Sequence, residues 1–378
     1  MNAKQKTKTR ERRHGKSQSS VNAPGQAIQR SAAQSAPGAD PSAAPSQQSG
    51  EKAVIASEHV SVKSHLSNAS SISELAPGQS LALLKALHIA TREGRINQDS
   101  RRKLKQVNHL YQFIEPALKS LTQANPTWTL VDHGAGKSYL GFILMDLYLR
   151  KQAPEAHVIG IERRHDLVEA SRALAREAGF EQMTFLALTA QESIESDQVP
   201  TQVEMVTALH ACDTATDDAI RFGLSRKAQF MVLVPCCQAE VASLLRQSKR
   251  PYDSDPFSEL WRRPLHTREF GSHLTNTLRC LQLEAHGYQV KVTELVGWEH
   301  AMKNELIIAQ RKGAPQRQAA CRLNAIVERI GLPALRERFF VPSFDPPLDA
   351  LTHDQIEPVP ASETDAPPEL NTGSSRRF

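Results

Sequence analysis

The sequence predicts an α/β protein built on a doubly wound, mostly parallel sheet of seven strands. Short apolar runs alternate with segments of helical periodicity between residues 126 and 310. A glycine-rich turn, with Gly134 and Gly136, follows the first apolar run. The series closes on two strand-like runs without a helix between them, which predicts an antiparallel C-terminal hairpin. The expected architecture is therefore Rossmann-like.

Composition divides the 378 residues into four regions. Residues 1–74 are a basic, low-complexity tail, and residues 336–378 form a proline-rich tail. Both tails lack the apolar side chains that would offset the entropy cost of ordering, so we expect them to be disordered. Residues 75–125 are expected to form an N-terminal helical cap, and residues 126–335 the α/β domain.

The cap is predicted from helical periodicity over residues 81–121. One face of this segment is apolar and includes Leu104, Val107, Leu110, Phe113, Ile114 and Leu118. The polar side carries a group of cations, namely Arg92, Arg95, Arg101, Arg102, Lys103 and Lys105.

The α/β domain is expected to alternate strands and crossover helices in chain order. The expected strands cover residues 128–132, 158–162, 183–188, 203–209, 229–234, 288–296 and 305–310. The expected helices cover residues 139–151 and 166–178 and, in broken form, 257–286. Asp166 is expected to cap the second of these helices and Gly179 to end it. Asp213 or Thr216 could cap the helix after the fourth strand.

The glycine-rich turn is compatible with three kinds of nucleotide site. Gly136-Lys137-Ser138 matches the end of a P-loop, but Val131 stands where that motif requires its first glycine. A nicotinamide or flavin site would place a third glycine at Tyr139. The third kind has an acid before the turn and a second acid at the end of the next strand. Asp132 and Glu162 satisfy that pattern.

This arrangement of acid, turn and acid resembles class I S-adenosylmethionine-dependent methyltransferases. The resemblance implies S-adenosyl-L-methionine as the cofactor, with Glu162 accepting hydrogen bonds from both ribose hydroxyls. It implies that Asp132 orients the loop and the cofactor's ammonium group. Gly134 and Gly136 would line the methionine portion, and Gln191 would contact the adenine.

A second group of residues follows the fourth strand. His210-Ala-Cys212, with Thr216-Asp217, resembles the His-x-Cys-x-x-x-Thr-Asp signature of a methyltransferase branch that includes eukaryotic tRNA 2′-O-methyltransferases. Residues 234–238 are similar to the Cys-Cys-His segment of that branch, with Gln238 in place of the histidine. Ala208 and Asp213 also depart from the branch pattern, which leaves the substrate open. The resemblance covers roughly residues 85–312.

The residues after the fourth strand supply the candidate catalytic groups. His210 and Asp213 are candidate general bases for an acceptor that must lose a proton, although each could instead pack or cap a helix. An aromatic ring beside cations, as in residues 298–303, suits a stacked base. The residues expected on the substrate side are Cys212, Cys236, Trp298 and His300.

Cysteine usage and hydropathy limit other interpretations. The five cysteines include an adjacent pair and form no Cys-x-x-Cys motif, which disfavours a disulfide framework and a structural zinc site. No apolar run approaches the roughly 18 residues of a membrane span. The basic N-terminus is not followed by the apolar segment of a signal peptide. We therefore expect a cytoplasmic protein without a membrane partner.

The charge of the chain does not identify the acceptor molecule. The net charge of +5 does not by itself identify a nucleic-acid partner. Residues 1–16 hold seven Lys and Arg residues against Glu11 alone, which fits either an RNA-binding or a solubilising tail. The sequence thus predicts a methyltransferase whose favoured acceptor is RNA, either tRNA or rRNA. A protein or small-molecule methyltransferase, and a non-catalytic RNA- or ribosome-binding protein on the same scaffold, remain alternatives.

Overall fold

The computed structural model describes residues 75–209, 211–235, 238–247, 259–260, 262–295, 305–345 and 347–348. The predicted tail at residues 1–74, and the part of the second tail from residue 349 onward, lie outside the described residues.

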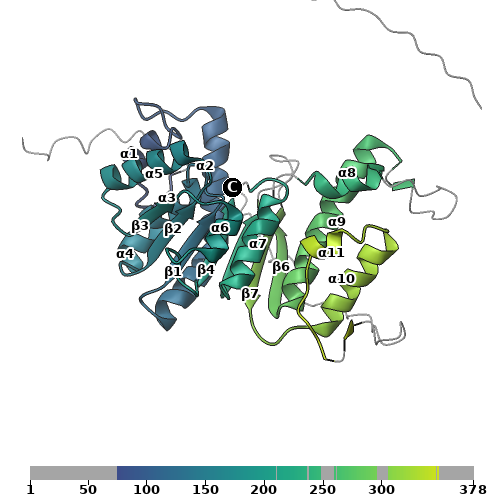
Figure 1. Ribbon diagram of the computed structural model, residues 1–378. Helices are drawn as coiled ribbons and strands as arrows, with labels where there is room; N and C mark the ends of the chain where they lie inside the picture. Colours follow the sequence, from purple (N-terminus) through teal and green to yellow (C-terminus); the bar gives the residue numbers. More distant parts are fainter. Residues whose placement is uncertain are drawn as a thin grey trace, which may run out of the picture. The chain divides into compact units, whose positions relative to one another are not determined.

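A seven-stranded sheet forms the centre of the described region, with strand order β3-β2-β1-β4-β5-β7-β6 (Figure 1). The strands are β1 (Thr129–His133), β2 (His157–Ile161), β3 (Met183–Leu186), β4 (Met205–Leu209), β5 (Phe230–Val234), β6 (Tyr288–Glu294) and β7 (Glu305–Arg311). Strands β1 to β5 pair in parallel, whereas β7 pairs antiparallel with both β5 and β6. The predicted doubly wound sheet and its C-terminal hairpin are therefore confirmed.

The order of the strands fixes where a ligand can bind. The chain passes outward from β1 to β2 and β3, then returns to β4 on the other side of β1. In open α/β sheets, ligands bind beyond the carboxyl ends of the strands at such a reversal. Asp132 of β1 pairs here with Thr207 of β4 and with Gly160 of β2.

One face of the sheet is covered by the helices that precede β3. They are α1 (Leu81–Ala86), α2 (Gln98–Ala124), α3 (Tyr139–Leu144), the π-helical turn η1 (Met145–Leu149), α4 (Arg150–Gln152) and α5 (His165–Ala178). Leu130 and Val158 point into this core together with Leu118 of α2 and Phe142 of α3. The cap is thus part of the main core and not an appended layer.

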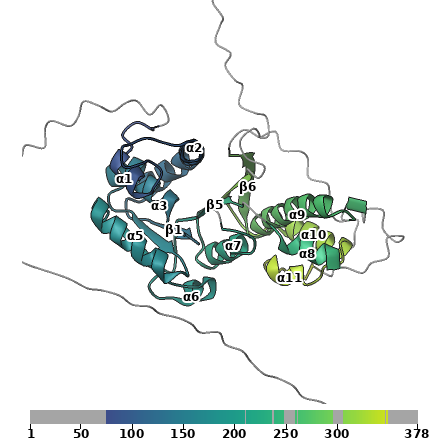
Figure 2. The same ribbon diagram turned by 90° about the horizontal axis from the view of Figure 1, so that it is seen from above.

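The opposite face carries α6 (Ala190–Glu195) and α7 (Ala215–Ser225), which pack over Val131 and Val206. A third core lies among four C-terminal helices beside β6 and β7 (Figures 1 and 2). These are α8 (Glu240–Gln247), α9 (Pro264–Ala285), α10 (Arg317–Arg329) and α11 (Leu335–Arg338).

The helical cap differs from the single long segment expected over residues 81–121. Residues 87–97 separate α1 from α2, with His88 at φ 57° and Gly94 at φ 80° in the left-handed region. Asn97 then starts α2, because its side chain accepts a hydrogen bond from the backbone N–H of Ser100. The apolar periodicity of the sequence runs on through residues 87–97, but the turn residues and the Asn97 cap divide the helix there.

Three expected helix caps were assigned wrongly. Helix α5 begins at His165 after Arg164, so Asp166 lies within the first turn, and only the predicted end at Gly179 holds. Helix α7 begins after Thr214. Thr216 instead donates its hydroxyl to the carbonyl of Ala211 at 2.6 Å. Asp213 bonds to a different helix, as described below.

The ordered region continues past residue 335, where the sequence analysis placed the second tail. Phe339 is only 1% exposed and packs in the third core. Arg338 of α11 lies 3.1 Å from Glu240 of α8. Helix α10 was not anticipated either, although Ala319, Leu323 and Val327 recur at helical spacing.

None of the described helices is both long enough and apolar enough to cross a membrane.

Candidate functional site

The glycine turn after β1 requires residues that tolerate a left-handed backbone. Gly134 has φ 69° and Gly136 has φ 57°, a region that is strained for most side chains. A Cβ atom placed on Gly134 would lie 3.8 Å from the Cβ of Ala211, in the loop after β4. The turn after β1 therefore lies directly against the loop after β4, as the strand order requires.

Glu162 follows β2 and ties the glycine turn to the second strand end. Its Oε2 accepts the Gly136 N–H at 2.9 Å, and its Oε1 accepts the Arg164 N–H at 3.0 Å. Burial raises the pKa of Glu162, but these hydrogen bonds and the Arg164 guanidinium outweigh burial, so the pKa is lowered. The carboxylate is therefore ionised near neutral pH, and it keeps lone pairs for further donors.

Asp132, at the end of β1, is buried beneath the turn and is 2% exposed. Its Oδ2 accepts the Ser138 hydroxyl at 2.9 Å, and its Oδ1 accepts the Thr207 hydroxyl at 3.0 Å. Burial raises the pKa of Asp132 to about 6, and these hydrogen bonds only partly oppose the rise. The carboxylate thus ties Ser138, at the end of the turn, to Thr207 of β4, and it titrates close to neutral pH.

Ser138 and Gly141 explain how the turn enters α3. Ser138 is fully buried, with a left-handed φ of 50°. A Cβ atom on Gly141 would lie 2.5 Å from the Ser138 Oγ, so this close approach requires glycine. Sequence reasoning missed Ser138 and Thr207, although both are polar residues within or beside apolar runs, where buried hydroxyls need partners.

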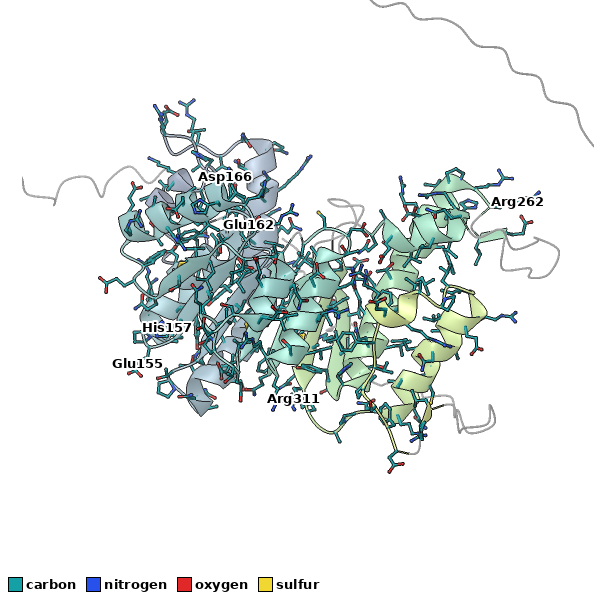
Figure 3. All side chains as sticks on the ribbon, viewed as in Figure 1. Glu155, His157, Glu162, Asp166, Arg262 and Arg311 are labelled. Carbon is teal, nitrogen blue, oxygen red and sulfur yellow. The ribbon has the colours of Figure 1, made fainter. Side chains whose placement is uncertain are left out.

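A cavity of about 700 Å³ opens at this edge of the sheet. Four of the predicted cofactor residues line it together, namely Asp132, Gly134, Gly136 and Glu162. Cys212, from the loop after β4, also lines it. In Figure 3, Glu162 lies at this edge, whereas Glu155 and His157 lie at the opposite edge. Volume and lining suit a ligand of nucleoside size.

Gln191, the expected adenine contact, is not among the residues that line the cavity. Its side-chain amide donates to Glu195 along the exposed side of α6. Thr189 and Ala190 line the cavity instead, at the start of α6. The residues that follow β3 do reach the site, but through the helix start and not through the Gln191 side chain.

The loop after β4 is held by contacts to distant helices. Asp213 adopts a left-handed φ of 53°. Its Oδ1 accepts the backbone N–H groups of Ala239 at 2.9 Å and Glu240 at 3.1 Å. Asp213 therefore caps α8, which follows β5, and does not line the cavity. The role of Asp213 as a general base stays a prediction, since the same carboxylate already has this structural role.

A buried ion pair fixes the same loop from behind. Arg279 of α9 is fully buried and bonds both oxygens of Asp217, at 2.7 and 2.9 Å. The same guanidinium donates to the backbone carbonyl of Asp213 at 2.8 Å and to Asn276 at 3.0 Å. Asn276 in turn donates to Glu305 at 2.6 Å, at the start of β7. One helix thus connects the loop after β4 with the last strand.

Gln238, which stands in place of a histidine in the compared branch, belongs to this buried network. Its amide donates to Asn276 at 3.3 Å, and its oxygen accepts the Ser272 hydroxyl at 2.6 Å. Gln238 is 3% exposed. The residue therefore anchors the segment after β5 on α9.

His133 is a further lining residue that the sequence analysis did not identify. Its Nε2 lies 3.3 Å from the Ser193 Oγ, which donates to the Ala190 carbonyl at 2.6 Å. Burial lowers the pKa of His133 to about 4, so the ring is neutral at physiological pH. Since the Ser193 proton is committed, Nε2 carries the proton of the imidazole.

Four predicted site residues, His210, Cys236, Trp298 and His300, lie outside the described residues. Within the described part of the chain, no group of three or more His, Cys, Asp or Glu side chains is arranged to hold a metal ion. His210, Cys236 and Cys237 are outside that part.

Comparison with protein families supports a methyltransferase. Residues 102–244 match the model of a family described as a methyltransferase domain. The match covers most of α2, the glycine turn, Glu162 and the loop after β4.

The chain also shares part of its sequence with an individual known protein. The chain is 28% identical over 182 residues to a bovine (Bos taurus) glutathione S-transferase C-terminal domain-containing protein. This stretch is 48% of the chain and spans a quarter, 25%, of the length of that relative.

Solved structures of methyltransferases also align with the chain. A putative O-methyltransferase from Klebsiella pneumoniae is 16% identical, with a TM-score of 0.38 over 64% of this chain and 94% of that one. The Podospora anserina methyltransferase bound to S-adenosylhomocysteine is 10% identical, with a TM-score of 0.36 over 61% of this chain and 88% of that one.

Proposed function

We propose that the protein is an S-adenosylmethionine-dependent methyltransferase and that its acceptor is RNA. The observation that carries the cofactor assignment is the joint lining of one cavity by the glycine turn and Glu162. The hydrogen bond from Gly136 to Glu162 fixes these two parts against each other. The family match over residues 102–244 supports the same reaction class.

The residues of the cavity fit the groups of this cofactor. The ionised Glu162 offers acceptor oxygens to a ribose diol, and the left-handed glycines let the backbone approach the ligand closely. Asp132 also lines the cavity, beneath the turn, and would balance the cofactor's ammonium group. When bound, the cofactor would supply a methyl group activated by a sulfonium centre.

The protein's own task is to align an acceptor atom with that methyl group and to exclude water. Ala211 and Cys212 form the side of the cavity that lies against the glycine turn, and we expect the acceptor to bind on that side. A hydroxyl acceptor must also lose a proton. We assign that role to His210 before Asp213, because the Asp213 carboxylate already accepts two backbone N–H groups.

The RNA assignment rests on the sequence resemblance and on charge. The signature around His210 and Cys212 resembles that of tRNA 2′-O-methyltransferases, and residues 1–16 carry seven Lys and Arg residues. Cations at this density match a phosphate backbone.

Calorimetry with S-adenosylhomocysteine tests the cofactor site. Glu162→Ala should weaken binding by roughly 1–3 kcal/mol, because it removes charge-assisted hydrogen bonds. Gly134→Val should weaken it as well, since valine does not tolerate the left-handed φ of 69°. Asp166→Ala is the matched control, because Asp166 is a nearby exposed acid that does not line the cavity (Figure 3).

Unchanged affinity in both the Glu162 and the Gly134 variants would contradict the cofactor site. Transfer of a labelled methyl group into fractionated RNA, protein and metabolites then identifies the acceptor class. Label in protein or metabolites alone would reject RNA as the acceptor. Cofactor binding without any transfer would favour a non-catalytic RNA-binding role.

A further inference from the structure

Exposed cations are concentrated just before α2 and in its first half. Six of them lie between residues 92 and 105, against the acids Glu93 and Asp99. We refer to residues 92–105 as the basic segment. Its exposed cations are Arg92, Arg95, Arg101, Arg102, Lys103 and Lys105. None of them lines the cavity described above.

The charges of the basic segment oppose the stability of the helix that carries them. Arg101 and Lys105 are four positions apart and Arg102 and Lys105 three apart, so like charges repel on one face. The cations also lie near the positive end of the helix dipole. In the second half of α2, Glu115 and Lys119 form an i,i+4 ion pair at 3.2 Å. The basic segment thus concentrates like charge at a local cost to helix stability.

The length of α2 carries the basic segment to the edge of the sheet where the cavity opens. Helix α2 has 27 residues and ends four residues before β1 begins, whereas β1 has 5 residues. These lengths correspond to about 40 Å of helix and about 17 Å of strand. The Tyr148 hydroxyl, late in the β1–β2 crossover, donates to Thr122 at 3.4 Å, so the end of α2 lies at the amino edge.

The first half of α2 therefore extends beyond the carboxyl edge of the sheet. Figure 1 shows the start of α2 rising past the edge where Glu162 lies in Figure 3, and Figure 2 views α2 nearly end-on. Further cations border the cavity at the same edge. Lys137, Arg163 and Arg164 are exposed and contribute to its lining.

We propose that the basic segment is the docking surface for the RNA backbone and delivers the acceptor nucleotide to the cavity. The inference rests on the proposed function, because it locates the acceptor of that reaction. A cationic surface without an apolar centre fits phosphates better than a protein, whose interfaces place aromatic and apolar anchors at the core. Among the described residues, the large exposed hydrophobic side chains are Leu260, Leu265 and Val292, all outside the basic segment.

The test uses the full-length protein with the four helical cations of the basic segment changed to glutamine, which preserves helix propensity. These changes are Arg101→Gln, Arg102→Gln, Lys103→Gln and Lys105→Gln. The control variant loses the same charge elsewhere, through Arg246→Gln, Lys291→Gln, Arg311→Gln and Lys312→Gln. Arg311 lies at the opposite edge of the sheet from Glu162 (Figure 3).

Binding of a fluorescently labelled RNA stem-loop is measured by anisotropy over a series of salt concentrations. The variant of the basic segment should bind at least about tenfold more weakly, and its slope of log affinity against log salt should fall by about 2–4. The control variant should match the wild-type protein. Affinity for S-adenosylhomocysteine should be the same in all three proteins.

Equal loss of RNA affinity in both variants, or no loss in either, would overturn the docking surface. Binding of poly-glutamate as tight as that of the stem-loop, with the same loss in the variant, would also overturn it in favour of an acidic protein partner. Failure of the proposed function would give a different result. In that case none of the three proteins binds S-adenosylhomocysteine, while RNA binding still depends on the basic segment.

Discussion

At the scale of single residues, Asp132 shows how burial and hydrogen bonds together set the pKa of an acid in the cavity. Burial favours its neutral form, whereas the hydroxyls of Ser138 and Thr207 favour the carboxylate. The outcome is a pKa of about 6, while Glu162 has a lowered pKa and stays ionised. Of these two acids that line the cavity, Asp132 is therefore the one that titrates near neutral pH.

This difference predicts a pH-dependent affinity for the cofactor product. A ligand that carries an ammonium group favours ionised Asp132, so affinity for S-adenosylhomocysteine should rise from pH 5 to pH 7 and then level off. The stability effect has the opposite sign. The folded pKa is about 6, above the ordinary 3.8, so the stabilisation that the neutral acid provides is lost as pH rises through this range. Calorimetry from pH 5 to pH 8 checks the first effect, and a slope that persists in Asp132→Asn would assign it to another group.

Asp213 yields a second prediction at this scale, because its carboxylate caps α8. Asp213→Ala should lower the free energy of unfolding by about 1 kcal/mol, the usual cost of a lost cap. Asp213→Asn keeps an acceptor oxygen and should retain most of that stability and near-wild-type turnover. His210→Ala should lower turnover by about 10²–10⁴-fold. Single-turnover methylation at several pH values checks both, and a large loss in Asp213→Asn would instead make Asp213 the base.

At the scale of elements, local patterns predicted the strands and the glycine turn but not the contacts between distant segments. Apolar runs located the five parallel strands, because a buried parallel strand is a nearly continuous hydrophobic stretch, and two further strand-like runs located the antiparallel pair β6 and β7. Asp132 and Glu162 were found because both directly follow such runs. The partners of Asp213 and Gln238 come from α8 and α9, and no spacing within the sequence reveals them.

The buried pair of Arg279 and Asp217 gives a prediction for these elements. The two side chains are 0% and 4% exposed, so Arg279→Met would leave the Asp217 carboxylate buried without its partner. We expect a loss of about 3–5 kcal/mol in the free energy of unfolding. Arg268→Met is the control on the same helix, because Arg268 is exposed and its ion pair with Glu269 is near the surface. Urea denaturation of both variants checks this, and equal losses would mean that the pair contributes nothing specific.

At the scale of the whole described region, the third core extends the α/β domain beyond its last strand. Phe339, directly after α11, packs in this core, and Arg338 of α11 reaches Glu240 at 3.1 Å and Asp218 at 3.9 Å. Asp218 lines the cavity, and Glu240 lies beside the cap that Asp213 provides. The C-terminal helices therefore support the loop after β4 from outside the sheet, and the composition-based boundary at residue 336 cuts through α11 and leaves out Arg338 and Phe339.

Two truncations test this support. A chain that ends after Leu335 loses Phe339 and Arg338, and burial of the Phe339 ring alone corresponds to about 3–5 kcal/mol. For a domain of this size that loss lowers the melting temperature by roughly 6–12 °C or more. A chain that ends after Leu348 keeps α11 and the contacts of Phe344 with the third core, and it should melt like the full chain.

Because Arg338 and Asp218 connect α11 to the cavity, the shorter chain should also lose acceptor turnover more than affinity for S-adenosylhomocysteine. Equal melting temperatures for the two truncations would mean that α11 adds no stability and that the α/β domain ends where composition placed it.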